Sequence, residues 1–211
     1  MIVILLILRD SSSRLARMTS LESLIKGRKR RLLKAREADL RDVREEIHSR
    51  GEITLRTELK PGDIGNLVYL HGVIYEREYG FDHTFEAYVA GPLSEFVLSD
   101  SKRERIWITE LDDRIVGCVA IVASSPETAQ LRWFLVDPSA RGRGLGRRLL
   151  NEAVAFSRAC DYRFIFLWTV SALVAAAHLY SSVGFRKVEE RPGKRWGVVV
   201  VEERYEMDLS S

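Results

Sequence analysis

A glycine- and arginine-rich segment, residues 136–148, is the part of this sequence best suited to chemistry. It reads Val-Asp-Pro-Ser-Ala-Arg-Gly-Arg-Gly-Leu-Gly-Arg-Arg, between an apolar stretch and an amphipathic one. Glycines let the backbone approach a ligand closely. The first N–H groups of a helix have no internal partner and lie at the positive end of its dipole. A strand that ends and a helix that begins here therefore predict a site for an anionic group such as a phosphate.

Two widespread phosphate-binding motifs do not match this segment. A P-loop requires Gly-x-x-x-x-Gly-Lys-Ser/Thr, and the sequence has no such run. A dinucleotide-binding fingerprint requires Gly-x-Gly-x-x-Gly. Counted from Gly142 or from Gly144, the third glycine would fall on Arg147 or on Leu149. The segment must therefore belong to another class of anion-binding loop.

The elements that hold this loop follow from the spacing of apolar residues. Alternating or continuous apolar runs predict strands over residues 52–59, 105–110, 114–123, 129–136, 164–168, 185–190 and 198–207. Helical spacing predicts one helix capped by Asp63 and a second capped by Asp82 that ends near Gly91–Pro92. Two more helices are predicted over residues 143–159 and 172–183. This order predicts a mixed α/β sheet with a parallel-leaning centre.

Residues 1–50 differ in charge from the rest of the chain. They hold 13 Lys/Arg and 7 Asp/Glu, a balance of +6, whereas residues 51–211 hold 20 and 23, a balance of −3. Apolar residues between 21 and 47 have helical spacing, so we expect a helical extension. The basic cluster Arg28–Arg31 could bind nucleic acid, but a solvated helix face is the favoured interpretation. The mildly acidic body is compatible with a cationic substrate.

The first residues and the cysteines indicate the compartment. The apolar run Met1–Leu8 is shorter than the roughly 20 residues of a membrane span, and no basic residues precede it as in a secretory signal. We interpret it as part of a truncated upstream element. The two cysteines, Cys118 and Cys160, exclude a disulfide framework and favour a reducing compartment. We therefore expect a cytoplasmic protein without a membrane partner.

Two motifs at the right spacing resemble those of the GNAT (Gcn5-related) N-acetyltransferases. Arg141, Gly144 and Gly146 match the signature Arg/Gln-x-x-Gly-x-Gly/Ala. About thirty residues later, the run 176–185, Ala-Ala-His-Leu-Tyr-Ser-Ser-Val-Gly-Phe, resembles the family's Ala-x-x-Leu-Tyr-x-x-x-Gly-Phe ending. The resemblance covers residues 52–209. It implies an α/β fold with a mixed, mostly antiparallel central sheet flanked by helices.

A narrower resemblance concerns domain organisation. The segments 131–133, 167–169 and 196–197 are similar to the acetyltransferase half of bacterial proteins that fuse a MarR-type winged-helix repressor to a GNAT domain. Residues 1–50 would then be the remnant of a winged-helix domain, which needs about twice that length. The resemblance thus implies two parts, an N-terminal helical extension (1–50) and a GNAT acetyltransferase domain (51–211).

The resemblance also implies a co-substrate and roles for particular residues. Acetyl-CoA would be the acetyl donor, and an amine would attack its thioester directly. The main chain of Leu135 and Val136 would pair with the pantetheine arm, and Tyr180 would protonate the departing thiolate as general acid. The loop would hold the cofactor through Arg141, Gly142, Arg143, Gly144, Leu145, Gly146 and Arg147.

Other site residues remain open at this level. Many family members have Asn where this chain has Leu173, which puts any polar role there in doubt. Glu110 and Glu127 could relay the amine proton through water, or could be solvated carboxylates. Arg132 could face the acceptor or lay its stem along the apolar strand surface. The four histidines show no metal-ligand spacing, so we expect no metal.

These observations favour an N-acetyltransferase that acts on a primary amine of a small molecule or peptide. The alternative is a regulatory module, associated with transcription control, that binds acetyl-CoA without using it. A nucleic-acid partner is not expected, because the sequence holds no complete DNA-reading fold. A homodimer is left open.

Overall fold

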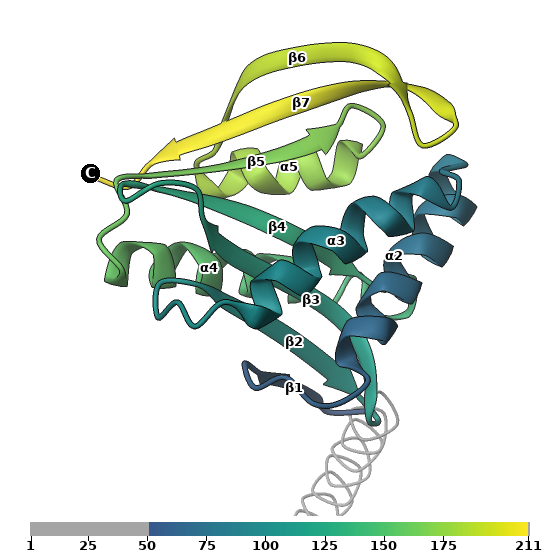
Figure 1. Ribbon diagram of the computed structural model, residues 1–211, viewed down its shortest axis with the longest axis horizontal. Helices are drawn as coiled ribbons and strands as arrows, with labels where there is room; N and C mark the ends of the chain where they lie inside the picture. The colour runs from purple at the N-terminus through teal and green to yellow at the C-terminus, as the bar shows by residue number, and fades with distance from the viewer. Residues whose placement is uncertain (1–50, 211) are drawn as a thin grey trace, which may run out of the picture. The chain divides into compact units, whose positions relative to one another are not determined.

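A computed structural model describes residues 51–210, and the predictions for residues 1–50 lie outside this part of the chain. Figure 1 shows its helices and strands. Along the chain they are β1 (Ile53–Arg56), α2 (Asp63–Tyr79), α3 (Thr84–Leu98), β2 (Arg105–Leu111), β3 (Arg114–Ala123), β4 (Thr128–Val136), the 3-10 helix η1 (Pro138–Ala140), α4 (Leu145–Ala159), β5 (Phe164–Val170), α5 (Val174–Val183), β6 (Arg186–Arg195) and β7 (Val198–Asp208).

The strands form one sheet in the order β1-β2-β3-β4-β5-β7-β6. Within the described residues β4 and β5 are the one parallel pair, and every other neighbouring pair is antiparallel. The expected mixed, mostly antiparallel sheet is therefore confirmed. The parallel pair follows from the connection, since helix α4 carries the chain from β4 back to the start of β5.

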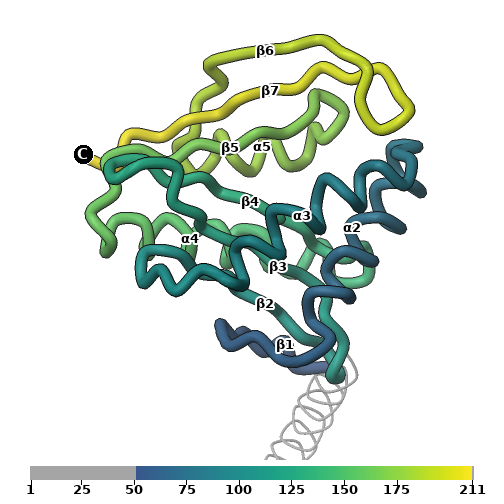
Figure 2. Tube along the Cα trace, in the orientation of Figure 1, coloured from purple at the N-terminus to yellow at the C-terminus, as the bar shows by residue number. Residues whose placement is uncertain are grey.

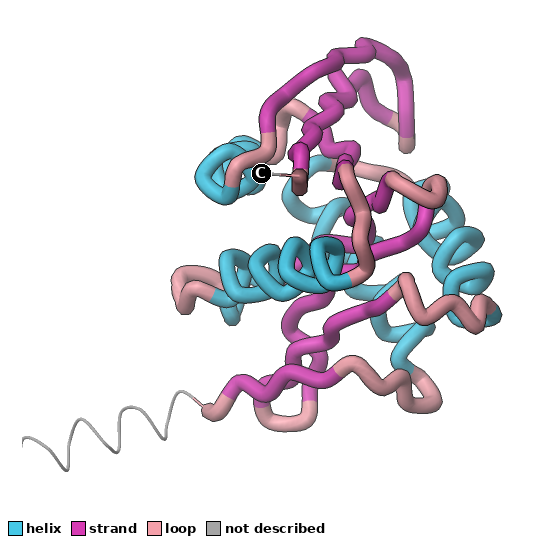
Figure 3. The backbone as a smooth tube through the Cα atoms, turned by 90° about the vertical axis from the view of Figure 1, so that its left-hand side faces the viewer, coloured by secondary structure: helices cyan, strands magenta, loops and turns pink. Residues whose placement is uncertain are grey.

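Helices cover both faces of this sheet, as Figure 3 shows. Strand β2 illustrates the pattern, because its successive side chains point to opposite faces. Ile106 and Ile108 belong to the core shared with α2 and α3, whereas the Trp107 ring on the other face lies 5.4 Å, between centroids, from that of Phe156 of α4. The two faces thus build two separate apolar cores. No helix in residues 51–210 combines the length and apolar character that a membrane crossing requires.

Strands β4 and β5 separate along their length, which opens the sheet in its middle (Figure 2). They pair only where Thr128–Gln130 meets Phe164–Phe166. A bulge marks the other edge of β4, because Arg132 faces Ala120 and Leu135 faces Cys118, so two residues lie opposite one. Trp133, inside this bulge, has a φ of 48°. Bulges bend a strand and are frequent beside functional sites.

The turn between β6 and β7 closes against α2 and α3. The carbonyl of Trp196 accepts a 2.9 Å hydrogen bond from the N–H of Asp82. The Trp196 ring lies 4.9 Å, between centroids, from the rings of both Phe81 and Phe85. This turn therefore joins the C-terminal hairpin to the connection between α2 and α3.

Several expected helix ends differ from the structure. Helix α3 has His83 rather than Asp82 as its N-cap, and α5 begins at Val174, two residues later than expected. Helix α3 does not end near Gly91–Pro92 but continues to Leu98, because Val89 and Leu93 on either side of the proline are both buried in the core. Asp63 is the first residue of α2 rather than its cap, and its carboxylate instead accepts a hydrogen bond from the N–H of Lys60. Helix α4 begins at Leu145, two residues later than expected.

Candidate active site

The glycine loop forms the wall of a cavity. Gly142 and Gly144 have φ values of 75° and 76°, which favour glycine, and a Cβ atom on either would meet nothing within 4 Å. Gly144 is the N-cap of α4 and supplies no side-chain cap for the helix. The first N–H groups of α4 therefore lie beside open space, as an anion site requires.

The cavity beside this loop has a volume of about 410 Å³. It brings together nearly all residues that the sequence proposes for the cofactor. Those lining it are Leu135, Val136, Arg141, Gly142, Gly144, Leu145, Gly146 and Arg147. Arg143 does not line it. The part of β4 that faces this space lies beyond the residues paired with β5, so its backbone groups have no partner from β5.

The arginines of the loop contact the protein itself. Arg141 donates to the carbonyl oxygen of Val136 at 3.1 Å and forms a 2.9 Å ion pair with Glu78 of α2. Arg147 donates to the Ser182 hydroxyl at 3.0 Å. Arg141 therefore joins the loop to α2, and Glu78 offsets part of its charge.

Packing explains why position 146 is a glycine, and the sequence alone does not reveal this. A Cβ atom there would lie 2.9 Å from Leu179 Cδ2 and 3.4 Å from Phe134 Cζ. The glycine therefore permits the close approach of α4 to both α5 and β4. Its place in the signature is explained by backbone packing as well as by any ligand.

A second cavity, of about 100 Å³, lies between β4, β5, helices α2 and α3 and the β6–β7 turn. Five aromatic side chains form much of its wall: Tyr75, Phe81, Phe85, Tyr88 and Trp196. Arg132 and Glu202 are the charged side chains that line it among residues 51–210. Glu202 also forms a 3.2 Å ion pair with Arg195.

The two cavities meet at four shared residues. Tyr75, Phe134, Leu173 and Tyr180 line both of them. The Tyr180 side chain is 4% exposed, and its ring centroid lies 5.8 Å from that of Phe134. Burial, and then the nearby Tyr75, raises the pKa of Tyr180 well above its ordinary value. Tyr180 is therefore a protonated phenol at the point where ligands in the two cavities would meet.

Tyr75 is a site residue that the sequence did not identify. Burial is the main cause that raises the pKa of this phenol too. Its ring stacks on that of His71, one helical turn earlier, with centroids 6.1 Å apart. The regular apolar spacing of α2 gives no signal that these two side chains reach a cavity, because core residues show the same spacing.

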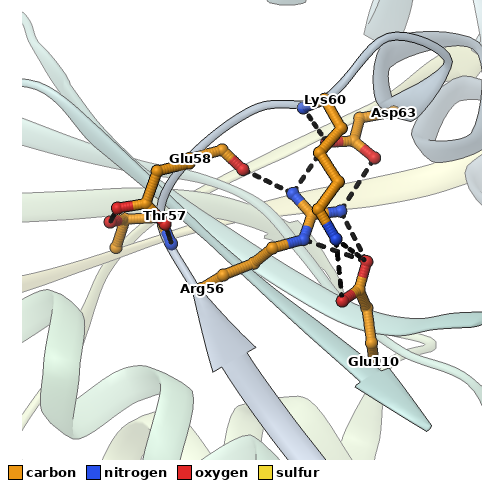
Figure 4. Close-up of polar contacts among 6 residues, drawn as sticks. All are labelled: Arg56, Thr57, Glu58, Lys60, Asp63 and Glu110. Carbon is orange, nitrogen blue, oxygen red and sulfur yellow. Dashed lines mark hydrogen bonds and ion pairs between the residues drawn. The ribbon is translucent and has the colours of Figure 1, made fainter. Parts of the chain in front are cut away.

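The two carboxylates considered as bases lie elsewhere. Figure 4 shows Glu110 in contact with Arg56 and Lys60. The Glu110 carboxylate accepts from Arg56 at 2.7 Å and forms a 3.3 Å ion pair with Lys60. The Arg56 hydrogen bond is the main cause that holds the pKa of Glu110 below its ordinary value. Glu127 is exposed in the loop before β4. Neither lines either cavity.

Comparisons with known proteins agree with this architecture. A model of the acetyltransferase (GNAT) family matches residues 72–185. N-acetylaspartate synthetase of Danio rerio is 34% identical over 85 residues, which are 40% of this chain and 30% of that protein. An uncharacterized N-acetyltransferase of Schizosaccharomyces pombe is 29% identical over 121 residues, 54% of this chain and 72% of that protein. The chain thus spans under a third of the synthetase.

Solved structures share the fold. A GNAT acetyltransferase from Staphylococcus aureus Mu50 superposes with a TM-score of 0.62 at 17% identity, covering 75% of this chain and 100% of that one. A putative acetyltransferase from Salmonella typhimurium, solved with its cofactor acetyl-CoA, superposes with a TM-score of 0.58 at 20% identity, covering 75% and 95%. The family match spans more than half of the sequence and includes both the glycine loop and Tyr180. The chain therefore belongs to the GNAT family of acetyltransferases.

Proposed function

We propose that this protein is an N-acetyltransferase that transfers the acetyl group of acetyl-CoA directly to a primary amine of a small molecule or peptide. The main observation behind this proposal is that two cavities meet at Tyr180. One lies beside the glycine loop, and the other is walled by aromatic rings. A transferase of this kind needs two ligands whose reacting atoms touch at one point.

The residues present fit acetyl-CoA in the 410 Å³ cavity. Gly142 and Gly144 leave open space beside the N-terminus of α4, which suits the pyrophosphate. The free edge of β4 at Leu135 and Val136 suits an amide-bearing arm that pairs like a strand. Bound there, acetyl-CoA supplies an activated acetyl thioester.

The remaining chemistry belongs to residues of the chain. The Tyr180 hydroxyl donates its proton to the sulfur as the carbon–sulfur bond breaks. Because burial raises the pKa of Tyr180, complete transfer requires that the thiol pKa also rise in the same dry site. Glu202 is the carboxylate of the second cavity, so it replaces Glu110 and Glu127 as the group that attracts the amine and accepts its proton through water.

The alternative function, a regulatory module that binds acetyl-CoA without using it, predicts affinity without turnover. No contact in residues 51–210 favours it over catalysis. The narrower similarity to MarR–GNAT fusion proteins stays a prediction, and so does the helical extension of residues 1–50.

A charge substitution at Gly144 tests the cofactor assignment. Gly144→Asp places a negative charge beside the pyrophosphate, whereas Gly144→Asn has nearly the same shape and no charge. Both side chains tolerate the left-handed backbone found there. By calorimetry we expect Asp to weaken acetyl-CoA binding at least about 10-fold relative to Asn, because like charges repel strongly at such range.

The two variants should have the same melting temperature, which separates binding from folding. Equal affinities for acetyl-CoA in the Asp and Asn variants would contradict the assignment. Thiol release with a panel of primary amines then separates the two functions, because a regulatory module would bind acetyl-CoA and release none.

A further inference from the structure

His71 presents an unsatisfied polar atom at the second cavity, of about 100 Å³, which we call the aromatic cavity. Its side chain lies on α2, is 3% exposed, and lines the 100 Å³ cavity. Its Nδ1 lies 2.8 Å from the carbonyl oxygen of Leu67, one turn earlier on the same helix. Its Nε2 is buried and has no hydrogen-bond partner among residues 51–210. Buried polar atoms without partners are rare, and because His71 lines a cavity, this one can receive a hydrogen bond from a molecule bound there.

The hydrogen bond to Leu67 defines what Nε2 can do. A carbonyl oxygen only accepts, so Nδ1 must carry the proton and donate it. In the neutral ring Nε2 then holds a lone pair and can only accept a hydrogen bond. Burial lowers the pKa of His71 to about 4, so the ring is neutral near pH 7. A group with so low a pKa is a poor base for an alkyl ammonium, but it remains a good acceptor for an N–H.

The surroundings of His71 point to the same kind of ligand. Thr169 of β5 lines the same cavity, and its buried hydroxyl also lacks a partner among residues 51–210. The other walls are largely aromatic, and aromatic faces attract an amine in its ammonium form. The His71 ring stacks on Tyr75, which lines both cavities, so Nε2 lies one side chain away from their junction.

We infer that the aromatic cavity takes the amine end of a simple alkylamine and that His71 Nε2 accepts a hydrogen bond from its nitrogen. His71 is thus a positioning residue that directs the amine toward the junction at Tyr180. This inference rests on the proposed acetyltransferase function. It adds the alkylamine class of the acceptor and the atom of this chain that orients it.

The test uses n-butylamine, whose nitrogen carries its only hydrogen-bond donors. In His71→Asn the amide nitrogen can keep the bond to Leu67, but the acceptor at the ring tip is lost. In His71→Gln the amide oxygen can reach the former place of Nε2, whereas the bond to Leu67 is lost. We expect kcat/KM for n-butylamine to fall about 10–100-fold in the Asn variant, mainly through KM. The Gln variant should recover a large part of this loss.

The outcomes separate the alternatives. A purely structural role of His71 predicts the reverse order, with Asn more active than Gln, and would overturn the inference. Wild-type protein that binds acetyl-CoA but never acetylates n-butylamine would overturn it as well. Wild-type protein that does not bind acetyl-CoA would instead refute the proposed function.

A measurement on wild-type protein covers the case in which either variant fails to fold. In the CoA complex, the ¹⁵N resonance of His71 Nε2 should shift when n-butylamine is added, while that of Nδ1 stays in place. No shift of Nε2 at saturating n-butylamine would contradict the contact.

Discussion

At the residue scale, Tyr180 decides whether the junction of the two cavities is catalytic. Tyr180→Phe keeps the ring, and with it the contacts to Phe134 and Tyr205, and removes only the hydroxyl. General acid catalysis contributes typically ~10²–10⁴-fold, so we expect kcat to fall by about that factor with acetyl-CoA affinity nearly unchanged. Steady-state kinetics and calorimetry measure the two quantities separately.

The matched control for this substitution is Tyr205→Phe. Tyr205 belongs to the same aromatic cluster but donates to Glu203 at 3.1 Å and lines neither cavity. Its loss should leave kcat within about two- to threefold of wild type, a margin typical of changes outside a site. Because burial raises the pKa of Tyr180, its ionisation should produce no falling limb in the rate below about pH 10. If the Tyr180→Phe variant kept the parental rate, where chemistry limits turnover, Tyr180 would belong to the core alone.

At the element scale, a cluster of charges anchors the start of α2 to the sheet (Figure 4). Arg56 of β1 lies 2.7 Å from Asp63 of α2 and 2.7 Å from Glu110 of β2. Burial alone would raise the pKa of Asp63, but the Arg56 and Lys60 hydrogen bonds lower it below its ordinary value. Since α2 carries His71, this cluster helps to set the position of one wall of the aromatic cavity.

The cluster predicts a stability that depends on pH. In Arg56→Met we expect the free energy of unfolding at pH 7 to fall by about 2 kcal/mol, because two partly buried carboxylates lose their partner. Both carboxylates have folded pKa values below their unfolded ones, so their contribution is present above about pH 4 and is lost as pH falls through the folded values. The difference between variant and wild type should therefore shrink below about pH 4 in urea unfolding.

Lys60→Met is the control for charge removal at the same place. The Lys60 side chain is 60% exposed and reaches Glu110 at 3.3 Å. Exposed ion pairs contribute about 1 kcal/mol or less, so this variant should unfold near the wild-type midpoint. If Lys60→Met cost as much as Arg56→Met, net charge rather than the buried contacts would explain the effect.

At the scale of the whole molecule, the aromatic cavity exists because the β6–β7 hairpin meets helices α2 and α3. Gly197, at the hairpin turn, has a φ of 80°, and a Cβ atom there would lie 2.7 Å from Asp82 Oδ2. Gly197→Ala should therefore displace the turn and its neighbour Trp196 from the cavity wall. We expect a KM for n-butylamine several-fold higher, a loss of about 1–2 kcal/mol in stability, and an unchanged Kd for acetyl-CoA.

Gly193→Ala is the matched control in the same hairpin. Gly193 lies in β6, and a Cβ atom there would meet nothing within 4 Å. This variant should keep the wild-type KM. If the two alanine variants behave alike, contact between the hairpin turn and the α2–α3 connection does not shape the acceptor site.

The sequence by itself determined the family, the order of the elements and the glycine loop. These features are local: apolar periodicity depends on residues a few positions apart, and Gly142 and Gly144 signal a backbone that other residues avoid. The strand end before Pro138 was predictable for the same reason, since proline cannot donate to a sheet. The match of Tyr180 to a motif identified it before its neighbours were known.

Only the tertiary structure decided which side chains line the two cavities. His71 and Tyr75 belong to the same helical stripe as core residues, and nothing local separates a residue that lines a cavity from one that fills a core. Glu110 was open as a base until its contact with Arg56, 54 positions away, assigned it to an ion-pair cluster. Helix α3 continues past Pro92 because burial of its flanking residues outweighs the lost hydrogen bond. In each case the deciding contacts are with residues distant in sequence. These contacts contribute more free energy than the local conformational preference of the chain.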